Sequence, residues 1–416
     1  MSIRRLEERL KKINSIGRRE EPGLFRLAYS KEESEAAALF RTWCEEEGMT
    51  CREDAAGNLI CRRAGEEEGP AAAVGSHLDT VYAGGGYDGT LGVLAGLEVI
   101  SRLNETNTVT RYPVEVIVFR AEESSRFGMA TIGSKLMSGN VAEKTLAGLM
   151  DRDGTSFFDA VKEAGYDPED LCRAFRAEDD IRAFFELHIE QGMILKSTES
   201  AVGIVDGIAA PYRMRVEVEG KASHSGTTPM SMRQDALTAA SELILHLEKA
   251  AIDERAFRTV ATVGRIEAYP GGMNIVPGRC QFDVDIRSTD RFSRKRIADS
   301  FQDLAKSLEA EREVQIRPEV ISEEDPVHLD TELRSRLLHS AESLGIESEV
   351  MMSGAGHDVM NMALRWPGAL IFVPSEEGLS HHPDEYTKME DILPGVDVLE
   401  ESIRKTAEEI TREVSS

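Results

Sequence analysis

Short apolar runs in the first half of the chain end in polar residues, and stretches with a helical period separate them. The runs AAAVGSHLDT (71–80) and VEVIVFRAEES (114–124) each predict a buried strand followed by charged side chains. Between them, residues 90–104 repeat their apolar positions with the period of a helix. This order predicts an α/β sheet with helices on both faces. Functional groups collect at the carboxyl ends of such strands, which is where both runs place their charges.

The pattern changes where RMRVEVEG alternates apolar and polar side chains, as a half-exposed strand does. A helix at 235–251, two strands, a helix at 294–311 and a last strand follow, which is the β-α-β-β-α-β order of a ferredoxin-like domain. The α/β pattern then resumes with GALIFVPS and a terminal helix. We therefore expect a larger domain of residues 1–211 and 325–416, with a smaller domain of residues 212–324 inserted into it.

Composition and charge limit the partners of this chain. Its 416 residues include 49 Lys and Arg against 75 Asp and Glu, and the net charge of −26 repels nucleic acid and anionic membranes. No apolar run approaches the roughly 20 residues of a membrane-spanning helix. Residues 1–20 read as a charged amphipathic helix and not as a signal peptide. The five cysteines form no C-x-x-C pair, which is typical of reduced thiols. We therefore expect a cytoplasmic protein.

Two polar motifs follow the first predicted strand. His77 and Asp79 end it, and a carboxylate two residues from a metal-bound histidine can accept the second ring N–H of that histidine. Asp88 follows glycines in AGGGYDG, whose flexible backbone can return a carboxylate to the strand end. In an alternative interpretation the glycines form a plain turn and Asp88 caps the next helix.

Further candidates follow other apolar runs. Glu122 and Glu123 point different ways, so one could bind a metal while the other acts as a free base, although a charged surface loop is the plainer interpretation. His188 lies in FFELHIEQG, and His381 and His382 lie in GLSHHPDEYT. A single histidine is more often structural, but His, Asp and Glu at several strand ends suit a catalytic divalent metal site. About five such ligands are enough for two ions bridged by one carboxylate.

These motifs carry a family resemblance that covers nearly the whole chain. In order, the sequence contains GSHLDTV, GGGYDGTLGVLAGLE, EESSRF, ELHIEQG, HSGTTPMSMRQDA, NIVPG, DIRS, SGAGHD and GLSHHPDE. The chain resembles the M20-type metal-dependent amidohydrolases, in the branch of N-carbamoyl-L-amino acid hydrolases, allantoate amidohydrolases and β-ureidopropionases. The resemblance implies a mixed-sheet, metallopeptidase-like catalytic domain with an inserted ferredoxin-like α+β domain that dimerises and acts as a lid.

The resemblance also implies roles for the residues at the strand ends. Asp88 matches a carboxylate that bridges two divalent metal ions, Glu122 matches the general base, and Asp79 matches the partner of His77. The implied metal ligands are His77, Asp88, Glu123, His188 and His381. Zn, Mn, Co and Ni all accept such ligands, so the identity of the metal stays open.

The implied substrate contacts come from both domains. Gln191, Asn274 and Arg287 match residues that hold the carboxylate and amide of the substrate. His224 matches a histidine that reaches the substrate of the partner subunit in a homodimer. Arg213 stands where allantoate hydrolases carry an arginine and carbamoylases often carry an apolar residue.

Three places depart from the family pattern. Ser124 replaces a glycine after the Glu pair, and Pro211 and Tyr212 replace a glycine-containing run. Two adjacent histidines compete for one ligand role, and the Ser-His spacing of the family favours His381 over His382.

The resemblance implies a hydrolase of linear amides that removes an N-carbamoyl or ureido group from an L-amino-acid-like small molecule. The products would be the amino acid, ammonia and carbon dioxide. Allantoate amidohydrolase is the nearest alternative. An aminoacylase or peptidase of the same superfamily is a further one, although HIEQG and HSGTTPM argue against it. A catalytically dead binding protein on this fold would be expected to lack a metal ligand, and every matched ligand is present.

Overall fold

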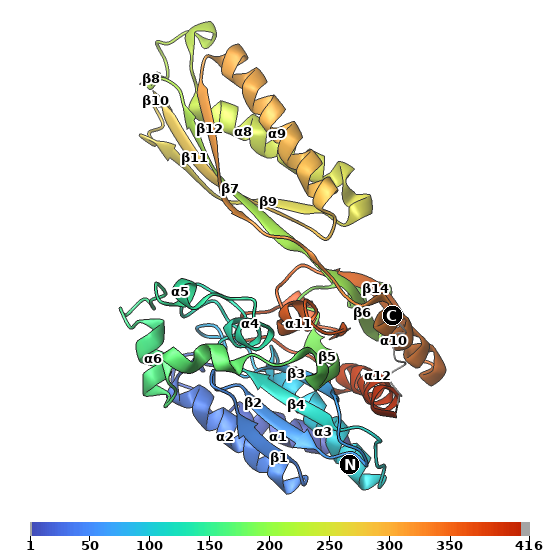
Figure 1. Cartoon of the computed structure of the whole chain (residues 1–416). Helices are drawn as coiled ribbons and strands as arrows, with labels where there is room; N and C mark the ends of the chain where they lie inside the picture. Colours follow the sequence, from blue (N-terminus) through green and yellow to red (C-terminus); the bar gives the residue numbers. More distant parts are fainter. Residues whose placement is uncertain (1, 409–416) are drawn as a thin grey trace, which may run out of the picture. The chain divides into compact units, whose positions relative to one another are not determined.

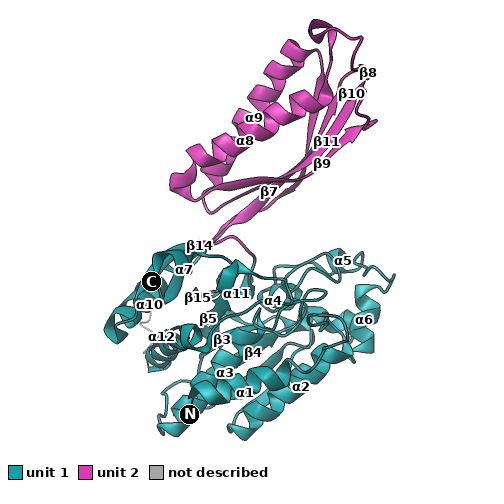
Figure 2. Ribbon diagram, turned by 180° about the vertical axis from the view of Figure 1, so that it is seen from behind, with its two compact units in different colours: residues 1–206, 329–351, 356–416 teal, residues 207–328, 352–355 magenta. Residues whose placement is uncertain are grey.

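The computed structural model describes residues 2–408 and divides into two compact units. The first contains residues 1–206, 329–351 and 356–416, and the second contains residues 207–328 and 352–355 (Figure 2). The expected boundaries at 212 and 324 fall inside the second unit, because its first long strand already begins at Ala210.

A mixed sheet forms the centre of the first unit, and its short edge strand at residues 327–328 consists of residues of the second unit (Figure 1). Within the described residues its order is β1-β2-β4-β3-β5-β15-β6-β13, and β14 pairs with β6. The strands are β1 (Thr50–Glu53), β2 (Leu59–Arg63), β3 (Ala71–His77), β4 (Val114–Phe119), β5 (Ile181–Ile189), β6 (Val202–Ile208), β13 (Val327–His328), β14 (Ser348–Ser353) and β15 (Gly368–Val373). β4, β3, β5 and β15 run parallel, so their carboxyl ends meet at one edge.

Helices cover both faces of this sheet, as the sequence predicted. The larger core lies between the strands and the apolar sides of α1 (Ser2–Ile13), α2 (Lys31–Glu46), α3 (Thr90–Glu105), α10 (Thr331–Leu344) and α12 (Met389–Glu408). On β5, Phe185 and Leu187 face this core, whereas Glu186 between them contacts α11 (Asp358–Met362) on the other face. The remaining helices of the unit are α4 (Ile132–Ser138), α5 (Glu143–Leu146), α6 (Phe157–Glu163), α7 (Ile194–Thr198), η1 (Pro168–Ala174), η2 (Glu178–Asp180) and η5 (Glu376–Gly378).

The second unit has the predicted ferredoxin-like order. Its antiparallel sheet runs β12-β7-β11-β9, and two long helices pack on one face of it (Figure 1). The elements are β7 (Ala210–Glu219), β8 (Ser223–His224), η3 (Met230–Met232), α8 (Ala236–Asp253), η4 (Arg255–Phe257), β9 (Val260–Tyr269), β10 (Ile275–Val276), β11 (Arg279–Ser288), α9 (Arg291–Arg312) and β12 (Gln315–Glu323). β7 buries alternate side chains such as Met214 and Val216, which explains the period of two in the sequence.

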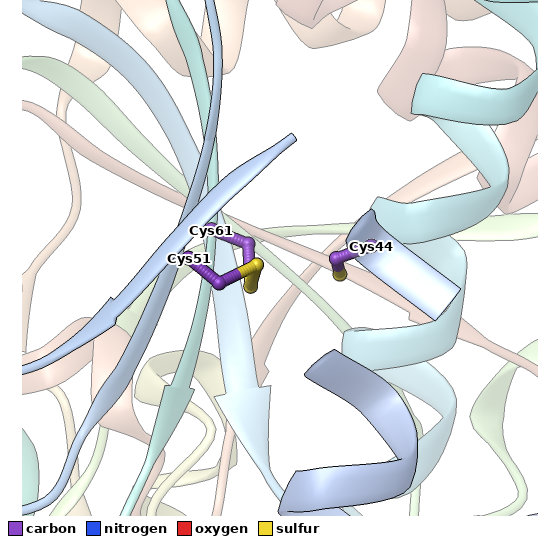
Figure 3. A group of neighbouring side chains, drawn as sticks. All are labelled: Cys44, Cys51 and Cys61. Carbon is purple, nitrogen blue, oxygen red and sulfur yellow. A yellow bond between two sulfur atoms is a disulfide. The ribbon is translucent and has the colours of Figure 1, made fainter. Parts of the chain in front are cut away.

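Two expectations from the sequence need correction. The amphipathic first helix ends at Ile13 rather than continuing to residue 20. Cys51 and Cys61 form a disulfide, so the prediction that all five cysteines are reduced was wrong for this pair. The two residues lie directly opposite each other across the β1–β2 pair, a register that their spacing does not reveal (Figure 3). The predicted cytoplasmic location stays a prediction, and no helix among residues 2–408 is long and apolar enough to cross a membrane.

Candidate metal centre

The candidate site lies at the carboxyl ends of the parallel strands of the first unit. β3 ends at His77, and β5 carries His188 one residue before its end. Glu122 and Glu123 follow β4 after a turn in which Ala121 has a φ of 53°. All four polar side chains are buried. The parallel pairing of β4, β3 and β5 therefore gathers side chains that lie far apart in the sequence.

Asp88 lies at the centre of this group. Its Oδ1 is 2.9 Å from Nε2 of His188 and 3.5 Å from Nε2 of His77, whereas its Oδ2 is 3.3 Å from Nε2 of His381. Nε2 of His381 is also 3.3 Å from Oε1 of Glu123. Two sets of candidate ligands therefore share Asp88, and the donor atoms of each set lie within 4.8 Å of one another.

This donor set fits divalent cations. It offers imidazole nitrogens and carboxylate oxygens, the ligands of catalytic Zn and related ions. Asp88, Glu122 and Glu123 are buried together, and their main charge partners are histidines. Because buried carboxylates need compensating positive charge, the cluster is built to hold cations.

The electrostatics agree with this interpretation. Burial would raise the pKa of Asp88, but the surrounding histidines outweigh burial and hold this pKa well below its usual range. Burial raises the pKa of Glu122 well above its usual range, although His77 acts in the opposite direction. Hydrogen bonds to Asp88 and Glu123 raise the pKa of His381 to about 11. A metal ion that binds at His381 would therefore compete with a proton for this ring.

Backbone carbonyls orient two of the rings. Nδ1 of His77 lies 2.9 Å from the carbonyl oxygen of Asp79, and Nδ1 of His188 lies 2.9 Å from that of Ile189. Because a carbonyl oxygen only accepts, each Nδ1 carries a proton and each Nε2 is directed toward Asp88. This is the usual way in which an outer contact prepares a histidine ligand.

The main hydrogen bonds of the Asp79 carboxylate are not with His77, the partner that the family resemblance implies. It accepts hydrogen bonds from the backbone N–H groups of Glu122 (3.2 Å) and Glu123 (2.9 Å), and lies 3.6 Å from Nδ1 of His77. β3 ends at His77, so the alternation of a strand does not extend to Asp79. Asp79 therefore positions the Glu pair, while its own carbonyl orients the ring of His77.

The glycine-rich segment serves close packing rather than a plain turn. Gly89 has a φ of 60°, and a Cβ at this position would overlap the ring of His77. Gly89 is the N-cap of α3 and no side chain caps this helix, so the alternative in which Asp88 caps it is wrong. The glycines let the loop bring the Asp88 carboxylate against His77 and His188.

The loop after β15 places its two adjacent histidines in different surroundings. His381 contacts Asp88 and Glu123, whereas Nδ1 of His382 accepts the N–H of Asp384 3.1 Å away and the ring is half exposed. Only the first of the pair joins the cluster.

The sequence analysis assigned no role to three polar side chains at this site. Ser380 Oγ lies 3.1 Å from Oδ2 of Asp88, and buried Glu385 accepts the N–H of Asp88 at 3.0 Å. His357, in the SGAGHD segment, is buried with its ring centre 4.6 Å from that of His188. Glu385 stands four residues after His381 in the same motif, which is the one signal that could have identified it.

The predicted substrate residues fall into both units. Gln191 donates its side-chain amide to Oδ2 of Asp88 at 3.0 Å. In the second unit, His224 on β8 pairs with Ile275 on β10, and the Ser225 N–H donates to the Asn274 carbonyl, so His224 and Asn274 are brought together.

Arg213 and Arg287 lie at the opposite end of the second unit's sheet. Both guanidinium groups bind Asp285, with Nε of Arg213 at 3.2 Å and Nη2 of Arg287 at 3.0 Å. Nη1 of Arg287 also donates to the carbonyl of Gly354 at 2.7 Å.

Comparison with known proteins identifies the family. Residues 62–405 match the peptidase family M20/M25/M40. The chain belongs to this family. It is 38% identical over 405 residues to an N-carbamoyl-L-amino acid amidohydrolase of Geobacillus stearothermophilus, covering 97% of this chain and 98% of that one. It is 36% identical over 386 residues to an allantoate amidohydrolase of Bacillus subtilis, covering 92% and 93%.

A crystal structure of a hydantoinase/carbamoylase family amidase from Burkholderia multivorans has the same M20 architecture. That structure and this chain superpose with a TM-score of 0.90 and are 32% identical in sequence, and the comparison covers 98% of each chain. Membership of the M20 family confirms the predicted fold class and the predicted hydrolase of amide C–N bonds.

Proposed function

We propose that this M20 enzyme removes an N-carbamoyl group from an L-amino-acid-like substrate, with two divalent metal ions in each subunit. The observation that carries this proposal is the position of Asp88, whose two carboxylate oxygens face two separate ligand sets. The first set is His77, Asp88 and His188, and the second is Asp88, Glu123 and His381. When bound, the ions would supply Lewis acidity for the hydrolysis.

Glu122 is the proposed general base. Its buried carboxylate belongs to neither ligand set, and its Oε2 lies 3.6 Å from Nε2 of His77. Burial raises the pKa of Glu122 well above its usual range, which suits a group that takes a proton from water and later gives it to the leaving nitrogen. Asp79 fixes the backbone on which this carboxylate stands.

Arg287 is the proposed anchor for the substrate carboxylate. Its guanidinium is already oriented by Asp285 and by the carbonyl of Gly354. A planar guanidinium held in this way binds a carboxylate with both geometry and charge. The side-chain amide of Gln191, beside Asp88, would add a polar contact to the substrate. Asn274 lies next to His224 at the other end of this sheet, so its amide would reach the substrate from the partner subunit.

The positions within the second unit support a homodimer with shared sites. Arg287 and Arg279 are eight residues apart on β11, and eight steps of about 3.3 Å span about 26 Å. His224 lies beyond the Arg279 end, because the N–H of Gly220, which follows β7, bonds to the carbonyl of Gly278. His224 and Arg287 of one chain are therefore too far apart to contact the same small substrate, and the partner's His224 would complete each site.

Allantoate is the second candidate substrate. Arg213 and Arg287 share Asp285, which places two guanidinium groups side by side. The second ureido group of allantoate needs polar partners that a simple carbamoyl amino acid does not need, and Arg213 could provide them.

A substrate screen tests the proposal. Metal-reconstituted protein would be assayed with N-carbamoyl-L-amino acids, allantoate, N-carbamoyl-β-alanine and N-acetyl-amino acids, with ammonia and amine release measured separately. We expect equal amounts of ammonia and free amino acid from a carbamoyl substrate. Preferred cleavage of N-acetyl-amino acids without ammonia would contradict the proposal.

A further inference from the structure

A second buried acid, Glu385, contacts the backbone of Asp88. Glu385 is 5% exposed and belongs to the loop between β15 and α12, the loop that also carries His381. Its Oε1 accepts hydrogen bonds from the backbone N–H groups of Tyr87 at 2.9 Å and Asp88 at 3.0 Å. One carboxylate thus joins the His381 loop to the loop that presents Asp88.

The glycine-rich loop is shaped around this contact. A Cβ at Gly85 would overlap the Glu385 carboxylate, so the loop reaches this acid only because residue 85 has no side chain. Ser380 extends the connection, because its Oγ lies 3.1 Å from Oδ2 of Asp88 and 3.4 Å from Oε2 of Glu385.

The charge of Glu385 distinguishes a functional role from simple packing. Two buried carboxylates side by side repel each other, so Glu385 next to Asp88 is unfavourable unless cations are bound nearby. Hydrogen bonds from N–H groups to an ionised acceptor are about twice as strong as neutral ones, so a carboxylate holds this flexible loop better than an amide would.

We propose that Glu385 is a positioning residue for the metal centre, which fixes the Asp88 carboxylate between the two ligand sets by clamping the glycine-rich loop to the His381 loop. This inference rests on the proposed function, because it assigns Glu385 to the same metal centre. Glu385 acts through the backbone N–H groups of Tyr87 and Asp88.

The test compares metal affinity in three variants of the full-length protein. Glu385→Ala removes the clamp, Glu385→Gln keeps an acceptor but removes the charge, and Asp384→Asn changes the exposed neighbouring acid as a matched control. Loss of an outer contact of a metal ligand weakens metal binding by about 10- to 100-fold. We expect that loss in Glu385→Ala, a smaller loss in Glu385→Gln, and affinity within about twofold of wild type in Asp384→Asn. Zn²⁺ affinity would be measured by competition with a chromogenic chelator.

Thermal unfolding separates this role from a merely structural one. Metal ions that bind only the folded state raise Tm. A structural role for Glu385 would lower the Tm of the metal-free and the metal-loaded protein equally. A positioning role reduces the increase in Tm that Zn²⁺ produces, and this reduced increase is the expected result in Glu385→Ala.

Wild-type Zn²⁺ affinity in folded Glu385→Ala would overturn the inference. If Glu385→Ala does not fold, wild-type affinity in Glu385→Gln would overturn it instead, as would an equal loss in Asp384→Asn. If the wild-type protein binds no metal, the proposed function itself is refuted. If the wild-type protein and Glu385→Ala both bind two ions with equal affinity, only the role of Glu385 is refuted.

Discussion

The substitution Glu122→Gln separates proton transfer from metal binding at this site. Glutamine has the same shape as glutamate, and the backbone N–H of residue 122 would keep its hydrogen bond to Asp79. Because Glu122 belongs to neither ligand set, the variant should keep two metal ions and its fold. Glu123→Gln is the matched comparison, since Glu123 contacts His381 in the second set.

The magnitude follows from the role. A positioned general base contributes about 10²- to 10⁴-fold to a rate. At 1.36 kcal/mol for each factor of ten, this is about 2.7–5.4 kcal/mol of barrier. We therefore expect kcat to fall by that factor in Glu122→Gln with unchanged metal content, and we expect Glu123→Gln to lose about one ion per chain.

Steady-state kinetics on the best substrate, with metal content measured by mass spectrometry on the same samples, checks both expectations. If Glu122→Gln loses metal while Glu123→Gln keeps it, the two roles are reversed. A Glu122→Gln variant with wild-type kcat would refute the assignment of the base.

Three further predictions address the ions, the substrate and the dimer. Asp88 and Glu123 raise the pKa of His381 to about 11, so a metal ion must displace the proton of this ring. Metal binding should therefore release protons and become tighter as the pH rises from 6 to 8, which calorimetry in buffers of different ionisation enthalpy would detect. An affinity that does not depend on pH would argue against His381 as a ligand. In Arg213→Leu, the second ureido group of bound allantoate would lose its hydrogen-bond partner, which costs about 1–3 kcal/mol. Allantoate turnover should therefore fall by about ten- to a hundredfold, while turnover of carbamoyl amino acids is unchanged. Equal effects on both substrates would mean that Arg213 only supports Asp285. Inactive His224→Ala and Glu122→Gln proteins should regain activity after subunit exchange, because about half of the dimers would then carry one intact site; no recovery after exchange proven by native mass spectrometry would exclude a shared site.

The sequence was most informative where the residues of a single strand or helix determine its local structure. The runs at 71–76 and 114–119, which are apolar except for Ser76 and Glu115, are strands buried on both faces, and polar residues at and after their ends form the site. The alternation in RMRVEVEG identified a strand with one buried face, and the helices after it completed the order of the smaller unit.

What the sequence could not show depends on register and loop conformation. The disulfide between Cys51 and Cys61 and the contact of Arg213 with Asp285 both follow from which residues face each other across strand pairs. Arg287 joins the same carboxylate from two residues along the strand of Asp285. Glu385 escaped notice because a single acid in a loop motif resembles any exposed acid until the structure shows it buried against Asp88.

The number of metal ions needed for activity tests the central claim most directly. Metal-free protein would be titrated with a divalent ion while ammonia release from an N-carbamoyl-L-amino acid is measured. We predict that activity is absent without metal and rises until two ions are bound per chain, because Asp88 presents one oxygen to each ligand set. Full activity in metal-free protein, or saturation after a single ion, would contradict a centre in which Asp88 bridges two ions.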